Sequence, residues 1–210
     1  MAHMVESRRG RGRPRQEDAP DHAYVERIAL TSFAAAGYDG ASVRQIAASA
    51  GVDPALVTRR YGSKFGLWKA TVNQLASRMA EMHTAIERLG DDPAHCRFRR
   101  ALELFVNFCC EVPELGRFFT DEIASPGERR EYVLDRIWRP NFTVMQALIR
   151  DAQSKGVVRA DDADILVFQL IGMVSMPLMM TSVIETEIGV HGEKIHARLL
   201  HSLERLLLNA

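Results

Sequence analysis

Helical spacing of apolar side chains continues through almost the whole chain, and this pattern most restricts the possible folds. In the first segment that shows it, the shared face carries Val25, Ile28, Ala29, Phe33 and Ala36. Segments with the same spacing follow to the C-terminus, and no useful length alternates apolar and polar residues as a half-buried strand would. The sequence therefore predicts an all-α fold with about nine helices.

Residues 42–61 predict two short helices separated by a tight turn. Ser42 and Gln45 match a capping box, and Gly51 breaks the first helix. Asp53 is an N-cap followed by Pro54 at the first helical position, and Ser63 is a further N-cap. This spacing is typical of a helix-turn-helix, although a hairpin of helices that only pack together has the same spacing.

The charges are unevenly distributed, although the formal net charge is zero. Residues 1–70 hold eleven Lys and Arg against seven Asp and Glu, and the remaining residues hold sixteen against twenty. Five of these basic residues form one run: Arg8, Arg9, Arg11, Arg13 and Arg15. Such asymmetry indicates contact with nucleic acid or a membrane surface. Residues 1–20, rich in Arg, Gly and Pro, are expected to form a disordered basic arm.

Three motifs resemble the TetR family of bacterial transcriptional repressors, over about fifty residues. They are F-x-x-x-G-Y at 33–38, S-V-x-x-I-A-x-x-A-G-V at 42–52 and G-S-K-x-x-L at 62–67. The resemblance implies a three-helix DNA-binding domain over residues 21–66 and a helical ligand-binding and dimerisation domain over 67–210. It also implies a repressor that a small apolar or amphipathic ligand releases from its operator.

The expected DNA contacts lie on the second and third helices and in the arm. In the family, the position of Arg44 reads guanine and that of Lys64 binds phosphate, while Thr58 replaces a phosphate-binding Tyr. The third helix is short enough for a major groove. The arm resembles an AT-hook of the minor groove, although a solubilising tail has the same composition. The full set is Arg11, Arg13, Arg15, Ser42, Val43, Arg44, Pro54, Ala55, Thr58, Arg59, Arg60, Tyr61 and Lys64.

The resemblance also places a ligand pocket and a dimer interface in the C-terminal part. The expected pocket residues are Phe98, Leu102, Phe105, Cys109, Trp138, Phe142 and Met145. The family dimerises through its last two long helices, here 163–184 and 193–208, and the expected interface residues are Phe168, Met173, Met176, Met180, Leu199, Leu203 and Leu206. A homodimer would bind two half-sites of a palindromic operator, about 34–36 Å apart.

The uncharged stretch 165–184 has the length of a membrane-spanning helix. Acidic flanks and polar residues within it favour a helix buried in a core or a subunit interface. The basic N-terminus lacks the apolar region of a secretory signal, and the odd set of Cys96, Cys109 and Cys110 predicts no disulfide framework. We therefore expect a cytoplasmic protein.

Two other classes of function were weighed against a ligand-responsive regulator. An all-α enzyme would need a recognisable nucleophile and base, and nothing in the sequence brings Asp121 or Glu122 to His95. An architectural DNA-binding protein would need no ligand. His191, His196 and His201 are five residues apart and fan around a helix, so the spacing predicts no metal site. We expect no catalytic residues and no cofactor.

Overall fold

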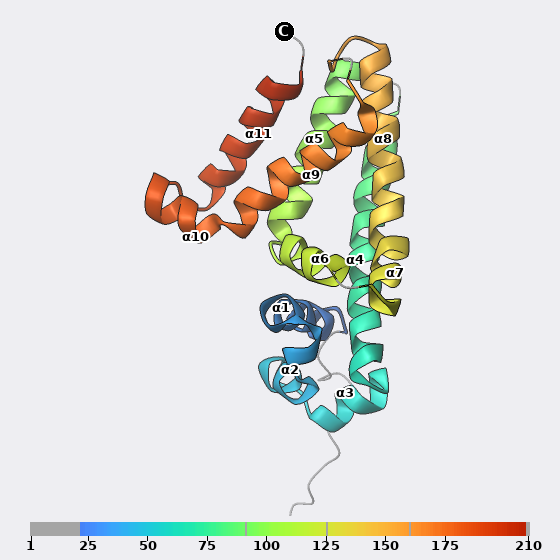
Figure 1. Cartoon of the computed structure of the whole chain (residues 1–210), viewed down its shortest axis with the longest axis vertical. Helices are drawn as coiled ribbons and strands as arrows, with labels where there is room; N and C mark the ends of the chain where they lie inside the picture. Colours follow the sequence, from blue (N-terminus) through green and yellow to red (C-terminus); the bar gives the residue numbers. More distant parts are fainter. Residues whose placement is uncertain (1–21, 91, 125, 160, 209–210) are drawn as a thin grey trace, which may run out of the picture.

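The computed structural model describes residues 22–90, 92–124, 126–159 and 161–208, and helices account for nearly all of these ranges (Figure 1). Within them the only β pairing is an isolated bridge between Val158 and Leu208. The helices are α1 His22–Gly40, α2 Val43–Ser49, α3 Pro54–Tyr61, α4 Lys64–Glu87, α5 Ala94–Glu111, α6 Leu115–Ala124, α7 Glu128–Val133, α8 Arg139–Ser154, α9 Ala163–Met179, α10 Thr181–Val183 and α11 Glu193–Leu207. The predicted all-α fold is confirmed.

Two π-helical turns continue helices rather than separating them. Leu134–Trp138 joins α7 to α8 in one uninterrupted helix, and Ile184–Ile188 extends α10. The first turn lies directly before Pro140, where the sequence predicted a bend, because proline lacks an N–H for the regular ladder. Counted this way, the described part of the chain holds ten helices.

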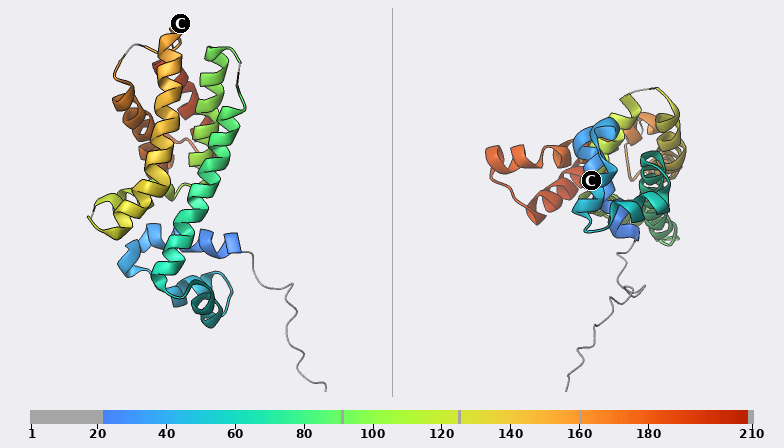
Figure 2. Two further views of the ribbon diagram at one scale, coloured as in Figure 1. Left: turned by 90° about the vertical axis from the view of Figure 1, so that its right-hand side faces the viewer. Right: turned by 90° about the horizontal axis from the view of Figure 1, so that it is seen from below.

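Helices α1 to α3 form a small head at one end of the molecule, and α5 to α11 form the body (Figures 1 and 2). The head buries Ile46, Ala47 and Val57 from α2 and α3 against α1 and α4. Helix α4 has 24 residues, about 36 Å, and runs from the head into the body. Any tilt of α4 therefore moves the head relative to the body.

Local sequence signals set most helix ends in the head. The Asp53 carboxylate accepts from the backbone N of Ala55 at 2.8 Å, and Gly51 takes a positive φ of 67° in the turn. The Ser63 hydroxyl accepts from the backbone N of Gly66 at 3.0 Å. These predicted caps are confirmed, but the Ser42 capping box was wrong. The Ser42 side chain makes no cap bond. Instead, the backbone carbonyl of Ser42 accepts the first hydrogen bond of α2, from Ile46 N at 2.9 Å.

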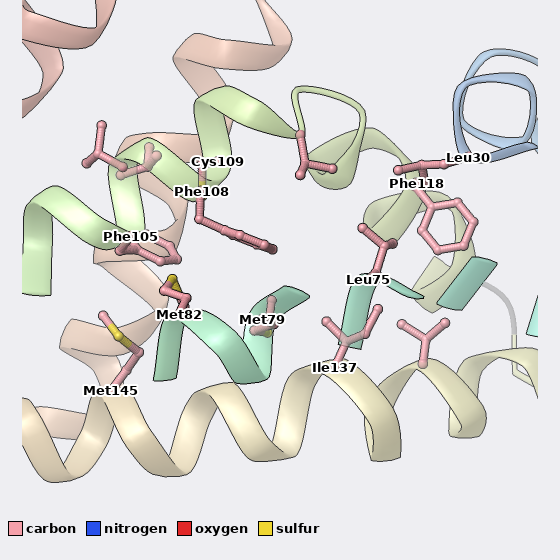
Figure 3. Packing of buried hydrophobic residues seen from close by; sticks show 14 of the residues in the cluster. Leu30, Leu75, Met79, Met82, Phe105, Phe108, Cys109, Phe118, Ile137 and Met145 are labelled. Carbon is pink, nitrogen blue, oxygen red and sulfur yellow. The ribbon is translucent and has the colours of Figure 1, made fainter. Parts of the chain in front are cut away.

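The core of the body lies between α4, α5 and the joined helix α7–α8. Figure 3 shows Phe105 and Phe108 of α5 beside Met79 and Met82 of α4, with Met145 of α8 facing the same space. All five side chains are buried. Their contacts fix the long helices against one another and leave α6 and α9 to cover the remaining sides.

The sequence predicted one long apolar helix over residues 163–184, and this prediction was wrong. Helix α9 ends at Met179, and the chain bends by 62° before Thr181. Pro177, which has no N–H, lies in the last turn. In the described ranges no single helix is long and apolar enough to cross a membrane, although the bent pair Ala163–Met179 and Thr181–Ile188 passes that test by length and composition.

Candidate nucleic-acid interface and ligand cavity

The outer surface of α2 and α3 presents six of the ten predicted DNA-contacting residues that the structure describes. The exposed ones are Arg44, Pro54, Ala55, Thr58, Arg59 and Arg60. No carboxylate in the described part of the chain pairs with any of the three arginines, so their charges are available to a ligand. Ser42 and Val43 are half-buried, and Val43 packs against the core of the head. The structure therefore favours Arg44 and the α3 residues as the contact surface.

Tyr61 and Lys64 are already engaged inside the head. The Tyr61 hydroxyl donates to Glu26 Oε1 at 3.3 Å, and burial, followed by the Glu26 charge, raises the pKa of Tyr61 to about 12. The Lys64 ammonium donates to the carbonyl of Asp39 at 3.1 Å and lies 4.7 Å from the Tyr38 ring centroid. Tyr61 is thus a packing residue, whereas half-exposed Lys64 keeps further donors for a phosphate.

The predicted arm residues Arg11, Arg13 and Arg15 lie outside the described residues.

A buried polar junction joins the head to the body, and the sequence pattern did not reveal it. Trp68 of α4 is fully buried, and its Nε1–H donates to Glu122 Oε1 of α6 at 2.9 Å. The other Glu122 oxygen accepts from Arg129 Nε at 2.9 Å. The Arg129 guanidinium lies 4.2 Å from the centroid of the Tyr38 ring on α1. Glu122 therefore links α4 to α7, and Arg129 extends this junction to α1 of the head.

Helix α6 also touches α1 directly. The Thr31 hydroxyl donates to Glu114 Oε1 at 2.9 Å, and Arg117 of α6 donates to the Ala35 carbonyl at 3.3 Å. Figure 1 shows α6 lying between the head and the rest of the body. A displacement of α6 would therefore also displace α1 of the head.

A cavity of about 560 Å³ lies on the opposite side of α6 from α1. It is bounded by α4, α5, α6, the joined helix α7–α8 and α9, and its lining residues are Met79, Phe105, Cys109, Leu115, Gly116, Phe119, Thr120, Ile123, Arg130, Leu134, Ile137, Trp138, Asn141, Phe168, Ile171, Gly172, Ser175, Met176 and Met179. The lining is predominantly apolar, and the volume is within the range of small-molecule sites.

Three of the predicted pocket residues line this cavity: Phe105, Cys109 and Trp138. Phe98, Leu102 and Met145 do not, because they are fully buried in the packing of α5 and α8 with α4. Phe142 lies just outside and contacts the rings of Trp138 and Phe168, at centroid distances of 5.9 and 6.0 Å. These four residues do not line the cavity, since helical spacing marks an inward face without saying what it faces. Which residues contact a ligand stays a prediction.

Aromatic side chains from three helices form one wall of the cavity. Phe119 of α6 stacks on Trp138 at 5.6 Å between ring centroids, and Trp138 meets Phe168 of α9 at 4.9 Å. Burial raises the pKa of the Cys109 thiol to about 12, with a further contribution from neighbouring Cys110. Cys109 therefore behaves as an apolar group of the lining.

Helices α9 to α11 carry an unusual number of exposed large apolar side chains. Together they are defined here as the apolar face: Ile165, Phe168, Met176, Met179, Met180, Val183, Ile188 and Leu206. Among the predicted dimer residues, Phe168 and Met176 also line the cavity, and Met173 and Leu199 are half-buried. Leu203 was wrongly assigned, because it is buried in the core of its own chain.

Comparison with known proteins identifies the head. The sequence model described as "Bacterial regulatory proteins, tetR family" matches residues 27–71, which span most of α1, all of α2 and α3 and the start of α4. Residues 27–71 therefore form a DNA-binding domain of the TetR-family type. TetR-family proteins are DNA-binding transcriptional regulators. No curated protein sequence matches the chain.

Solved structures share the fold of about nine-tenths of the chain at low identity. A protein titled a candidate fatty acid metabolism regulator, from Clostridium perfringens, has a TM-score of 0.69 and 18% identity, over 89% of this chain and 100% of its own. AibR, in complex with isovaleryl coenzyme A and operator DNA, has a TM-score of 0.68 and 17% identity, over 89% of this chain and 98% of its own. FadR from Bacillus subtilis, in complex with stearoyl-CoA, has a TM-score of 0.66 and 14% identity, over 90% of this chain and 98% of its own.

Proposed function

We propose that this regulator is a dimeric repressor, released from a palindromic operator when a small apolar or amphipathic molecule enters the cavity. The observation that carries the proposal is the position of α6, which forms a wall of the cavity and also bonds to α1 of the head. In this proposal residues 21–66 read DNA, residues 67–210 sense and dimerise, and the protein acts in the cytoplasm without enzymatic activity.

The DNA contact is assigned to α3 in the major groove, with Arg44 of α2 beside it. An arginine can donate to both O6 and N7 of guanine, and such a pair discriminates by about 1–3 kcal/mol. The small exposed residues Pro54 and Ala55 let α3 approach the base edges closely. Arg59 and Arg60 at the end of α3 supply positive charge for phosphates, which fixes orientation rather than sequence.

A second copy of the chain is the proposed cover for the apolar face. Eight large apolar side chains between Ile165 and Leu206 are exposed, Met180, Val183 and Leu206 among them. Exposed apolar side chains gathered on a few neighbouring helices are typical of an interface in a soluble protein. Replacing Leu206, 58% exposed, with Glu should dissociate the dimer in sedimentation experiments, whereas Tyr24→Glu on the head should not.

Release of DNA requires that the ligand bind better to the conformation that does not fit the operator. Coupling free energies of about 1–3 kcal/mol are typical, and a nearly complete switch requires about 5.5 kcal/mol. A ligand against Phe119 or Leu115 pushes α6, whose Arg117 is bonded to α1, as is Glu114 directly before the helix. Two fold neighbours hold coenzyme A thioesters, which supports an acyl compound as the ligand.

The test begins with selection of bound DNA from random sequences, followed by footprinting at stated salt. We expect two half-sites related by a dyad, and Arg44→Ala should weaken operator binding about 5- to 150-fold. Arg88→Ala is the matched control, because Arg88 is exposed at the far end of α4. Recovery of sequences without a palindrome, or equal loss in both variants, would contradict the proposal.

A further inference from the structure

We infer that the cavity is built for an apolar ligand that carries one anionic group, and that Arg130 anchors this group. The inference rests on the proposed function, because it identifies the class of ligand for the same cavity. The ligand class is an alkyl or acyl chain that ends in a carboxylate or a comparable organic anion.

Arg130 lines the cavity with an unused hydrogen-bond donor. Its Nε atom is buried, and no group among the described residues accepts from it. The nearest acids in the sequence pair with other cations: Glu128 with Lys69, and Glu131 and Asp135 with Arg139. The preceding arginine, Arg129, is held by Glu122. Arg130 is thus left without an internal partner in a part of the molecule rich in ion pairs.

No acidic side chain lines the cavity in the described part of the chain, so nothing there neutralises Arg130. Two of the other polar lining groups, Thr120 and Asn141, have partners of their own. The Thr120 hydroxyl donates to the Gly116 carbonyl at 2.8 Å, and Asn141 Oδ1 lies 3.1 Å from His83 Nε2. The cavity therefore combines apolar walls with a single positive charge.

The chemistry of the guanidinium explains why an anion fits best. An arginine stays protonated in proteins, so it cannot relieve its burial by losing a proton. A buried donor without a partner is costly, and more so when the group is charged. A carboxylate accepts two parallel bonds from the planar guanidinium. A neutral apolar ligand would fill the cavity and leave the Nε–H unpaired.

The joined helix α7–α8 also sets the direction of the ligand. Arg130, Leu134, Ile137 and Asn141 follow one another at helical spacing along the face that lines the cavity. From Arg130 to Asn141 the helix rises about 16 Å. With the anion at Arg130, the chain lies along Leu134 and Ile137 and ends near Asn141.

The experiment compares dodecanoate with dodecanol by isothermal titration calorimetry on the full chain. The two probes share a chain and differ in charge. We expect the wild-type protein to bind dodecanoate about 10- to 150-fold more tightly than dodecanol, since the free energy of a hydrogen bond to a charged group corresponds to that ratio of affinities. Arg130→Met should lose this preference and retain dodecanol binding. Arg136→Met is the control, because Arg136 is exposed on the same joined helix and does not line the cavity.

One further variant locates the site, and the thermal midpoint of Arg130→Met checks its folding. A Cβ at Gly172 would meet nothing within 4 Å, so Gly172→Leu extends into the cavity and should block both probes. Since Arg130 has no partner to lose, Arg130→Met should leave the thermal midpoint of the unliganded protein unchanged or raised. Dodecanoyl-CoA is the third probe. It has a thioester in place of the free carboxylate, and its negative charges lie on the phosphates of coenzyme A, farther from the alkyl chain.

Equal affinity for dodecanoate and dodecanol, unchanged by Arg130→Met, overturns the inference. Failure of all three probes to bind overturns it as well. Displacement of a fluorescent operator duplex is measured with the same probes. If dodecanoate binds in an Arg130-dependent way and the operator stays bound, the anchor stands and ligand-induced release in the proposed function fails.

Discussion

The hydrogen bond between Trp68 and Glu122 should contribute strongly to stability, because both groups are buried at the junction of head and body. Trp68→Phe removes the donor, and Glu122→Leu removes the acceptor. A hydrogen bond to a charged group is worth about 1.5–3 kcal/mol, and an orphaned buried donor costs about 1–3 kcal/mol. Each single variant should therefore lower the free energy of unfolding by at least about 2 kcal/mol.

The double variant leaves neither group unpaired, so its cost should fall short of the sum by about 1.5–3 kcal/mol. For a chain of this size, 2 kcal/mol corresponds to about 4–8 °C in the unfolding midpoint. Urea unfolding followed by circular dichroism, at several protein concentrations, measures this coupling. The ion pair of half-buried Lys69 and exposed Glu128, at 3.1 Å, is the comparison cycle and should give less than about 1 kcal/mol. Equal couplings in both cycles would refute the role of the junction.

Three further predictions follow from single residues. Exposed Cys96 should react with a thiol reagent at pH 8 well before Cys109, whose raised pKa leaves almost no thiolate; equal labelling would contradict this. The raised pKa of Tyr61 favours the neutral phenol in the folded state, so its stabilisation is complete below pH 10 and lost between pH 10 and about 12. Tyr61→Phe should flatten the alkaline loss of stability measured by urea unfolding, and an identical pH profile would count against it. Gly66→Ala should lower the thermal midpoint, because a Cβ there would lie 1.9 Å from the Tyr61 carbonyl; Gly172→Ala, with open space, should not.

Much of the head could be predicted from the sequence because its signals act over a few residues. Asp53 and Ser63 cap the helices that follow them, and Gly51 forms the turn between α2 and α3. The exposed residues of α3 then follow from helical spacing. Ser42 shows the limit of such rules, because its capping box is present in the sequence and absent from the hydrogen bonds.

The C-terminal site was only partly predictable. Phe98 and Phe105 share the apolar face of α5, yet Phe98 packs into the core and Phe105 lines the cavity. Periodicity identifies the inward face of a helix, and the neighbour opposite each turn decides whether a side chain meets protein or space. Arg130 was missed for the same reason, because one of the two neighbouring arginines on α7 has no distinguishing spacing.

The sequence by itself determined that the chain is helical, where the caps and the tight turn of the head lie, and which residues of α3 are exposed, because caps, turns and periodicity are local properties. Tertiary structure decided everything that depends on distant partners. Glu122 meets Trp68 across 54 residues of sequence, and the cavity exists only where five helical segments fail to fill the space between them. Those contacts depend on the relative placement of whole helices, which no local pattern specifies.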